Sequence, residues 1–391
     1  MNIVIDARWI FEEISGIGNY TRQLLAEYAG MEIPHRLIAL FNSPDLEART
    51  RAETGIDKAP HIETRCVPWG IFDAKSQLLL PRWLRHEQVR VFHSPNYMIP
   101  FLAFQRNAAG PLRAVTTIHD LIPLRFPDHA PKSKKARLMP LFRFLLREAA
   151  HRSALVLTVS ETSRQDIIEL LKPPPQRVKA IYNGVSQRFF STAGGGEDTN
   201  AKPATDAPLL LYVGRSDPYK NIATLLHALA SLRLREGMNV RLCIAGAPDP
   251  RYPEPAALAQ HLGIAEAVQW TGYLTDEALI ATYRQADLLV HPSRYEGFGL
   301  QILEAMACGT PVVSSNAGSL PEVVGDAGRL VAPDDVDGFV REIKAILGTP
   351  SLAARLRANG RKQAARFTWK ETARQTFTAY LEAVGEKENA R

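Results

Sequence analysis

The sequence has few cysteines and no long hydrophobic run. Its three cysteines, Cys66, Cys243 and Cys308, lie far apart among 391 residues. Disulfide scaffolds and cysteine zinc sites need paired or closely spaced cysteines, so neither is expected and a reducing, cytoplasmic compartment suits the chain. Charged residues appear at Asp6 and Arg8, which leaves no apolar segment for a signal peptide. No later window holds about 18 uninterrupted apolar residues, so no transmembrane helix is expected.

Several functional motifs are also missing. No histidines and carboxylates show the spacing of a metal site such as H-E-x-x-H, and no serine stands in a G-x-S-x-G turn. Basic and aromatic residues are not interleaved as in nucleic-acid-binding modules. We therefore expect no metal, no serine-hydrolase triad and no nucleic-acid partner.

The composition is that of a globular protein, with 46% hydrophobic and 23% charged residues. This length predicts two large domains. The net charge of +6 is uneven: Lys and Arg counted against Asp and Glu give +8 over residues 1–190 and −2 over residues 191–391. The basic half could bind an anionic membrane surface, a phosphorylated substrate or nucleic acid. It could equally be ordinary solvated surface, and net charge alone does not distinguish among these possibilities.

Short β-rich runs alternate with helical segments along the chain. This alternation predicts βαβ units and mostly parallel sheets. Residues 191–207 hold Gly, Thr, Asp and Pro but no large apolar residue, which predicts a linker or exposed loop between a domain at 1–190 and a second α/β domain at 208–366. Ligands are expected at the carboxyl ends of the strands, in the crevice between the halves.

The glycine motif of Gly16 and Gly18 follows a predicted strand and opens a helix. Such a position favours an anion-contacting or sugar-contacting loop, although it is also a common structural turn. It is a poor dinucleotide fingerprint because Thr21 occupies the third glycine position, and Asn42 and Ser43 stand where a ribose-binding acid is needed. An NAD-dependent oxidoreductase is therefore a minor alternative.

The most informative segment is Y-E-G-F-G-L-Q-I-L-E-A-M-A-C-G-T-P, which begins at residue 295. Glu296 precedes Gly297 and Gly299, and the pattern predicts a helix that starts near Leu300. Unpaired amides and the positive end of the helix dipole favour a diphosphate there. Glu304, one turn further on, could then reach hydroxyls attached to that diphosphate, unless it is an ordinary solvated helix residue.

Two further groups of residues follow predicted strands. Arg215 and Lys220 leave the first strand of the second domain, where a guanidinium and an ammonium can hold a phosphate pair. With the predicted anion-binding helix they suggest a pyrophosphate site. His119, Asp120 and Ser160 close strands of the first domain, so they are expected at the same crevice, although a single histidine is as often structural.

Residues 132–152 combine seven Lys and Arg residues with Leu, Met and Phe. This pattern predicts either a basic amphipathic helix on an anionic membrane or a helix packed on the sheet with a basic outer face. Pro140 predicts a kink or a helix start.

Together these motifs resemble retaining glycosyltransferase family 4. The resemblance covers almost the whole chain and rests on the E-x7-E element of Glu296 and Glu304, on V-G-R and K-N before it, and on the A-C-G-T-P-V-V run after it. It implies the GT-B fold, in which two Rossmann-like domains face a cleft. It also implies that a C-terminal helix, here about residues 367–384, returns to the first domain.

The resemblance implies roles for individual residues. Arg215 and Lys220 would bind the diphosphate of a nucleotide-sugar donor, and Glu304 would bind its ribose. Glu296 would lie beside the transferred sugar, and no divalent metal or other cofactor would be needed. The expected catalytic residues are His119, Arg215, Lys220 and Glu296; the donor site would also include Gly16, Gly18, Gly297, Phe298, Gly299, Leu300 and Glu304, with Asp120 and Ser160 on the acceptor side.

The H-D-L-I-P segment that begins at His119, followed by Pro127 and His129, looks like the bacterial mannosyltransferases that assemble O-antigen. The expected donor is therefore GDP-mannose, with UDP-glucose or another UDP-hexose second. The expected acceptor is a saccharide or lipid-linked saccharide, which would bring the enzyme to the inner face of the cell membrane. A nonhydrolysing sugar-nucleotide epimerase of the same architecture is a further alternative.

Overall fold

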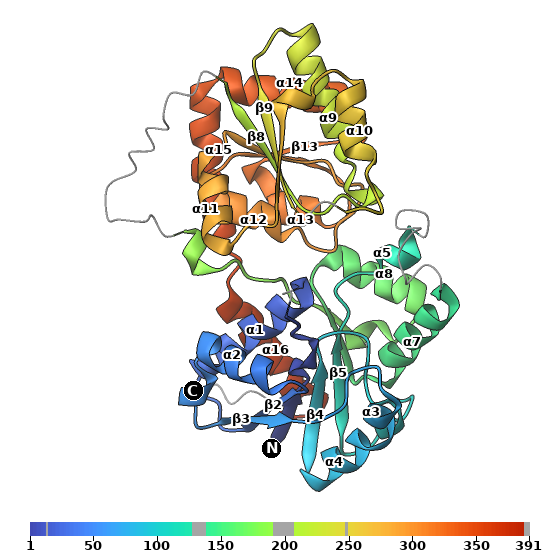
Figure 1. Ribbon diagram of the computed structural model, residues 1–391. Helices are drawn as coiled ribbons and strands as arrows, with labels where there is room; N and C mark the ends of the chain where they lie inside the picture. Colours follow the sequence, from blue (N-terminus) through green and yellow to red (C-terminus); the bar gives the residue numbers. More distant parts are fainter. Residues whose placement is uncertain (13–14, 127–137, 191–206, 247–248, 387–391) are drawn as a thin grey trace. The chain divides into compact units, whose positions relative to one another are not determined.

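The computed structural model describes residues 1–12, 15–126, 138–190, 207–246 and 249–386. They form two α/β units, which are described separately (Figure 1). Unit 1 holds the described residues of 1–125, 138–184 and 369–386, and unit 2 holds Phe126 and those of 185–368. The predicted linker at 191–207 lies outside the described residues except for Ala207.

Unit 1 is built on a seven-stranded sheet in which every strand pair is parallel. Its strands are rich in Val, Ile and Leu and are largely buried, as expected when helices cover both faces of a parallel sheet. In spatial order the strands are β3 (Ile62–Cys66), β2 (Arg36–Phe41), β1 (Asn2–Ile5), β4 (Val89–Ser94), β5 (Arg113–Thr117), β6 (Leu155–Thr158) and β7 (Val178–Ala180).

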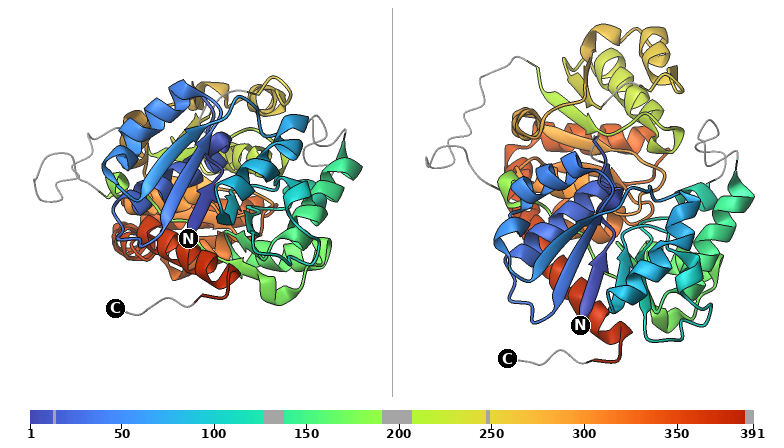
Figure 2. Two further views of the ribbon diagram at one scale, coloured as in Figure 1. Left: turned by 90° about the horizontal axis from the view of Figure 1, so that it is seen from below. Right: turned by 60° about the horizontal axis from the view of Figure 1, so that its bottom comes forward.

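The last helix of the chain, α16 (Trp369–Ala383), belongs to unit 1 and lies against α1 (Gly16–Ala29) (Figure 2). Thr372 Oγ1 donates to the Tyr182 carbonyl at 2.7 Å, which fixes the start of α16. The remaining helices are α2 (Pro44–Thr54), α3 (Ala74–Leu78), α4 (Leu80–His86), α5 (Ile122–Arg125), α7 (Met139–Arg152) and α8 (Glu161–Leu171), with short 3-10 turns η1 (Ala7–Trp9) and η3 (Phe101–Ala103).

Unit 2 is built on a six-stranded sheet, again parallel at every named pair. In spatial order its strands are β10 (Val268–Gly272), β9 (Arg241–Ala245), β8 (Leu209–Val213), β11 (Leu288–His291), β12 (Val312–Ser315) and β13 (Arg329–Val331). The chain builds outward from β8 in one direction and from β11 in the other, so the strand order reverses between these two neighbours. Loops at such a reversal diverge and leave room for a ligand at the carboxyl ends of the strands.

Helices pack on the sheet of unit 2 around a core that includes Leu225, Leu242 and Phe339. From Val336 onward the described chain forms three helices, and Pro350 starts the second of them after Gly348. The helices are α9 (Ile222–Ala230), α10 (Glu254–His261), α11 (Asp276–Gln285), α12 (Leu300–Ala307), α13 (Leu320–Val324), α14 (Val336–Gly348) and α15 (Pro350–Ala364). The predicted class, two Rossmann-like α/β domains with mostly parallel sheets, is confirmed.

Candidate active site

The strand reversal of unit 2 brings two of the predicted segments together. β8 and β11 are direct neighbours; β8 leads into the loop that carries Arg215 and Lys220, and β11 leads into the loop that carries Glu296. Both loops therefore leave the same edge of the sheet.

Lys220 and Glu296 form a buried ion pair. The Lys220 ammonium donates to both carboxylate oxygens of Glu296 at 2.7 and 2.9 Å, and His291 Nε2 lies 2.9 Å from Oε1 of the same carboxylate. Burial alone would disfavour the charged forms of Lys220 and Glu296. The combined effect of the Lys220 ammonium and His291 is larger than that of burial, and it holds the pKa of Glu296 well below its ordinary value. The pKa of Lys220 is raised, because the attraction of Glu296 exceeds the cost of burial. Both charges therefore persist through the physiological pH range.

Arg215 is exposed and held by a buried carboxylate. Its Nε and Nη2 donate to Asp217 at 2.8 and 2.5 Å, and Asp217 is almost completely buried. Arg251 makes a weaker contact with Asp217 at 4.0 Å. The loop thus places one exposed guanidinium and one buried ammonium at the end of β8.

Gly299 ends the β11 loop and begins α12. Its φ of 98° is left-handed, and a Cβ there would lie 2.9 Å from a Leu320 methyl, so glycine is needed. No side chain caps α12, and amides in the first turn of a helix have no partner within it. The helix starts at Leu300 as predicted, and the amides of its first turn can donate hydrogen bonds to an anion.

A turn at Gly318 and Ser319 holds the loop that carries Glu296. Ser319 Oγ donates to the carbonyls of Glu296 and Phe298 at 3.0 Å each. Gly318 has φ +59°, and a Cβ there would lie 2.8 Å from the backbone nitrogen and oxygen of Glu296. This close approach fixes the backbone from Glu296 through Gly297 to Phe298.

Glu304 lies one turn into α12 and is half-buried. The Tyr283 hydroxyl donates to its carboxylate at 2.8 Å. Burial raises the pKa of Glu304 to about 7, although the Tyr283 hydrogen bond and the charge of Arg188 pull in the other direction. Glu304 is thus not an ordinary solvated helix residue, and it changes protonation near neutral pH.

In unit 1, the predicted His119, Asp120 and Ser160 follow the adjacent parallel strands β5 and β6. Asp120 accepts from the Ile122 amide at 3.0 Å, and Ser160 caps α8 by accepting from the Ser163 amide at 3.0 Å. The side chains of Asp120 and Ser160 therefore have local structural partners.

His119 is held by the backbone and by an aromatic ring. Its Nε2 lies 3.0 Å from the Pro95 carbonyl, so this nitrogen carries the proton and Nδ1 is left as the acceptor. Burial lowers the pKa of His119, which keeps the ring neutral. Tyr20 packs edge-on against it with ring centroids 4.9 Å apart, and the Tyr20 hydroxyl lies 3.2 Å from Thr117 Oγ1.

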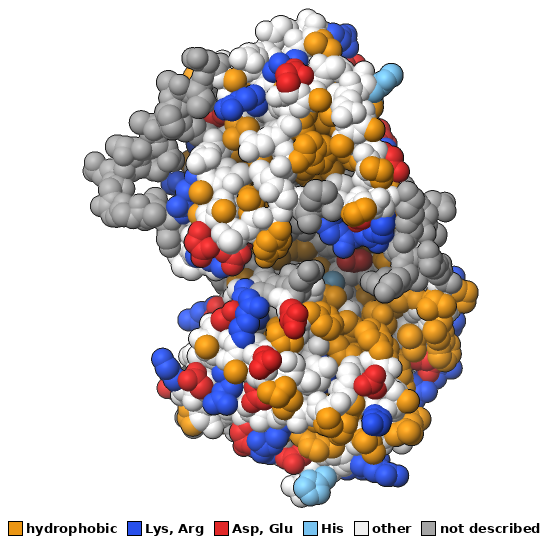
Figure 3. Space-filling model, in the orientation of Figure 1, with side chains coloured by type: hydrophobic (Ala, Val, Ile, Leu, Met, Phe, Trp, Pro, Cys, Tyr) orange, Lys and Arg blue, Asp and Glu red, His pale blue; other side chains and the backbone are white. Residues whose placement is uncertain are grey.

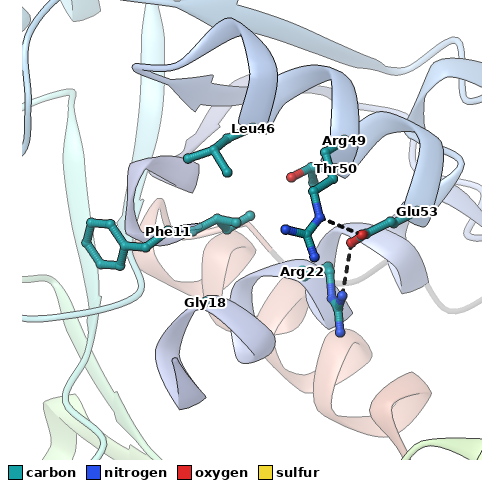
Figure 4. Close-up of a pocket in the computed structure, with 8 residues that line it drawn as sticks. Phe11, Gly18, Arg22, Leu46, Arg49, Thr50 and Glu53 are labelled. Carbon is teal, nitrogen blue, oxygen red and sulfur yellow. Dashed lines mark hydrogen bonds and ion pairs between the residues drawn. The ribbon is translucent and has the colours of Figure 1, made fainter. Parts of the chain in front are cut away.

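The glycines of α1 lie in its first turn, where the Ser15 side chain accepts from the Gly18 amide. A Cβ at Gly18 would lie 3.3 Å from the Trp9 carbonyl. Gly18 also lines a cavity beside Arg22, Arg49 and Glu53 that is too small for a nucleotide (Figure 4). The local packing thus accounts for Gly18 as a close approach between helix and loop, and donor contact by Gly16 and Gly18 stays a prediction.

Sequence reasoning did not identify four residues of this region, which are His291, Tyr283, Gly318 and Ser319. Nothing in the sequence indicated that Tyr283 would be the partner of the Glu304 carboxylate. Among the described residues, no group of three or more His, Cys, Asp and Glu side chains could hold a metal ion.

Comparisons with known proteins agree on one family. The model described as "Glycosyltransferase Family 4" matches residues 14–188, and the model described as "Glycosyl transferases group 1" matches residues 197–363. The O-antigen chain mannosyltransferase B of Escherichia coli is 32% identical over 97% of this chain and 99% of its own length. The MMP alpha-(1->4)-mannosyltransferase of Mycolicibacterium hassiacum is 36% identical over 59% of this chain and 54% of its own.

A solved structure shows the same fold. HepE of Anabaena, crystallised with UDP and glucose, superimposes with a TM-score of 0.72 over 96% of this chain and 98% of its own, at 19% identity.

Proposed function

Because the chain belongs to glycosyltransferase family 4, we propose that it transfers mannose from GDP-mannose, with retention of anomeric configuration, to a saccharide or lipid-linked saccharide during cell-surface polysaccharide synthesis. The observation that carries the proposal is the similarity to an O-antigen chain mannosyltransferase over nearly the full length of both chains. A second mannosyltransferase, from another organism, supports the choice of sugar.

The geometry of unit 2 suits a diphosphate leaving group. As the bond between sugar and phosphate breaks, negative charge grows on the departing oxygens, and fixed cations and amide dipoles stabilise it without reorganising. The first-turn amides of α12, Arg215 and Lys220 supply such groups at the strand reversal. Glu304 would accept hydrogen bonds from the ribose hydroxyls.

The ion pair between Lys220 and Glu296 links the two roles expected for these residues, diphosphate binding by Lys220 and a place beside the transferred sugar for Glu296. Both carboxylate oxygens of Glu296 bind Lys220, so Glu296 orients the ammonium and partly neutralises it before the donor binds. Charge that develops on the leaving diphosphate then competes with Glu296 for Lys220. No nucleophilic carboxylate is assigned, and retention is attributed to attack by the acceptor from the face that the diphosphate leaves.

The acceptor domain would contribute His119. With Nε2 committed to the Pro95 carbonyl, its Nδ1 can accept a hydrogen bond from a sugar hydroxyl. None of the described helices is long and apolar enough to cross a membrane. A lipid-linked acceptor would therefore be met by peripheral contact of the described part of the chain.

The decisive experiment presents GDP-mannose, UDP-glucose and other nucleotide hexoses and measures released GDP or UDP. Release from GDP-mannose alone, together with an α-linked product from this α-configured donor, is expected. Release from a UDP-hexose would favour the second candidate, which the UDP-bound structural neighbour supports.

An epimerase would interconvert sugar nucleotides without releasing GDP or UDP, and nuclear magnetic resonance spectra of the donor would reveal this. The NAD-dependent alternative is not retained, because the family models and the full-length relative are glycosyltransferases.

A further inference from the structure

Unit 1 exposes an unusual number of large apolar side chains on one side (Figure 3). Soluble proteins rarely expose a large continuous apolar surface unless it binds something. We call this surface the apolar face; its residues, with their exposed fractions, are Phe72 (62%), Leu78 (60%), Leu102 (67%), Leu138 (60%), Leu141 (51%) and Phe144 (59%).

The apolar face is carried by α3, η3 and α7 together with the residues just before α3 and α7. Hydrogen bonds hold these three elements together. Gln77, on α3, accepts from the Phe101 amide of η3 at 2.8 Å and donates to the Ile99 carbonyl at 3.1 Å. Arg152, at the end of α7, donates to the carbonyls of Phe101 and Phe104. The loop before α3 and the side of α7 also pack on one hydrophobic cluster. The apolar face is therefore a preformed surface of the folded unit.

The helix α7 is apolar on two sides. Phe142 and Leu146 point into the core, as in an ordinary helix packed on a sheet. Leu141 and Phe144 are exposed, although packing on the sheet does not require apolar residues there. The outer face of α7 is therefore apolar as well as basic, which goes beyond the predicted basic outer face. Residues 132–137 of the predicted segment 132–152 lie outside the described residues.

Within α3, η3 and α7, the exposed charged side chains are all basic. The exposed charged side chains of α3, η3 and α7 are Lys75, Arg143 and Arg147. The one acid in these elements, Glu148, is buried and paired with Arg152 at 2.9 Å. The exposed acid Asp73 precedes α3 and accepts from the Gly70 amide.

The combination of exposed apolar side chains with basic neighbours indicates which kind of partner the apolar face binds. If a second copy docked by twofold symmetry, the same surface would meet itself, and the cations of one copy would approach those of the other. An anionic lipid bilayer offers both an apolar interior and negative headgroups, which complement Leu and Phe flanked by Arg and Lys. We propose that the apolar face of unit 1 docks reversibly on an anionic bilayer surface, with its Leu and Phe side chains in the headgroup boundary and Lys75, Arg143 and Arg147 at the level of the lipid phosphates.

The proposal is tested by sedimenting the full chain with vesicles of phosphatidylcholine alone or mixed with phosphatidylglycerol. Binding is expected mainly to the mixed vesicles and should fall as salt rises. The double variant Leu141→Glu/Phe144→Glu should lower partitioning by about tenfold or more, because apolar burial is lost and negative charge is added. Arg143→Gln/Arg147→Gln should lower binding to mixed vesicles and leave the weak binding to neutral vesicles unchanged.

The matched control is Leu234→Glu, which adds the same charge at a 65% exposed leucine of unit 2. It should bind vesicles like the parent chain. Circular dichroism melting curves should coincide for all variants, since every substitution is at an exposed position. A variant that melts early is replaced by Leu102→Glu, on η3, which tests the same surface.

Vesicle binding by the double variant that equals binding by the parent chain would overturn the proposal, as would equal, salt-independent binding to both vesicle types. A third result would also overturn it: the parent chain binds no vesicles and instead forms dimers, and Leu141→Glu disperses these dimers. Vesicle binding needs no donor, so its outcome is independent of the nucleotide-sugar assay.

Discussion

Glu296 and Glu304 are separated by seven residues but have opposite environments. The Lys220 ammonium and the contact with His291 keep Glu296 ionised, whereas Glu304 has a neutral hydroxyl partner and a pKa of about 7. A pair of carboxylates whose pKa values are pushed apart usually divides its tasks. The contrast predicts different consequences for the same substitution at the two positions.

Glu304→Gln is expected to weaken binding of GDP or UDP about tenfold to a hundredfold, because charge-assisted hydrogen bonds to the ribose hydroxyls are worth roughly 1.5–3 kcal/mol. Calorimetric titration with each diphosphate provides the measurement. Tyr283→Phe is the companion variant: it removes the 2.8 Å hydrogen bond that holds the carboxylate and should produce a smaller loss. Unchanged affinity in Glu304→Gln would show that this carboxylate does not contact the ribose.

Glu296→Gln should spare diphosphate binding and depress turnover, an effect expressed in the transition state. It should also destabilise unit 2 by about 3 kcal/mol, since the buried Lys220 ammonium loses its counter-charge. Urea unfolding measures this cost, and adding Lys220→Met should recover part of it. Loss of GDP and UDP binding in Glu296→Gln, with binding intact in Glu304→Gln, would reverse the two assignments.

Diphosphate affinity is expected to depend on pH through Glu304. Its pKa of about 7 is raised by burial, so the free protein is largely protonated below that pH. Ribose hydroxyls donate better to the ionised form, and binding must therefore release a proton when the pH is low. Affinity should rise by up to about tenfold per pH unit up to pH 7 and level off above it.

The diphosphate itself also titrates near this pH, so the control for the pH profile is Glu304→Gln, measured with the same ligand. The component that comes from Glu304 is the difference between the two profiles. Parallel profiles for the parent chain and the variant would remove Glu304 as its source.

At the scale of helices and strands, much of the architecture follows from hydrophobic pattern. The alternation of apolar runs with helical segments predicted the parallel sheets, and the glycines at 297 and 299 predicted the start of α12 at Leu300. These features are local, since a few adjacent residues determine each of them.

Contacts between segments that are distant in the sequence could not be predicted from such local patterns. Tyr283 reaches Glu304 from another helix, and nothing in its own sequence neighbourhood distinguishes it from a core residue. His291 lies only five positions before Glu296, but its contact depends on how the loop after β11 folds back. The pairing of Lys220 with Glu296 also joins residues 76 positions apart. The sequence indicated both charges as site residues, but the pairing depends on β8 and β11 being neighbours.

The elements around the strand reversal predict that catalysis is independent of divalent metal. The first-turn amides of α12 and the cations of the β8 loop supply the positive field that a metal ion provides in other enzymes. Donor turnover should therefore survive exhaustive chelation and should not increase when magnesium or manganese is added. Activity that disappears in chelator and returns with either ion would contradict this prediction.

On the scale of the whole molecule, the order of the chain and the division into units do not coincide. The polypeptide leaves unit 1 near residue 184, builds unit 2, and returns to unit 1 for α16. On α16, Tyr380 Oη lies 2.6 Å from His93 Nδ1, and His93 Nε2 lies 2.8 Å from Thr117 Oγ1. Burial lowers the pKa of His93 to about 3, so this buried connection between α16, β4 and β5 stays neutral.

Truncation after residue 368 is therefore expected to unfold unit 1 and leave unit 2 folded. The removed helix buries Trp369, Phe377, Tyr380 and Leu381, which together contribute about 6–12 kcal/mol. That is comparable with the whole stability of a typical domain, about 5–15 kcal/mol. Hydrogen exchange followed by mass spectrometry should show protection lost in β1–β7 and retained in β8–β13, whereas truncation after residue 386 should preserve both. Retained protection of β1–β7 without α16 would mean that unit 1 does not depend on the returning helix.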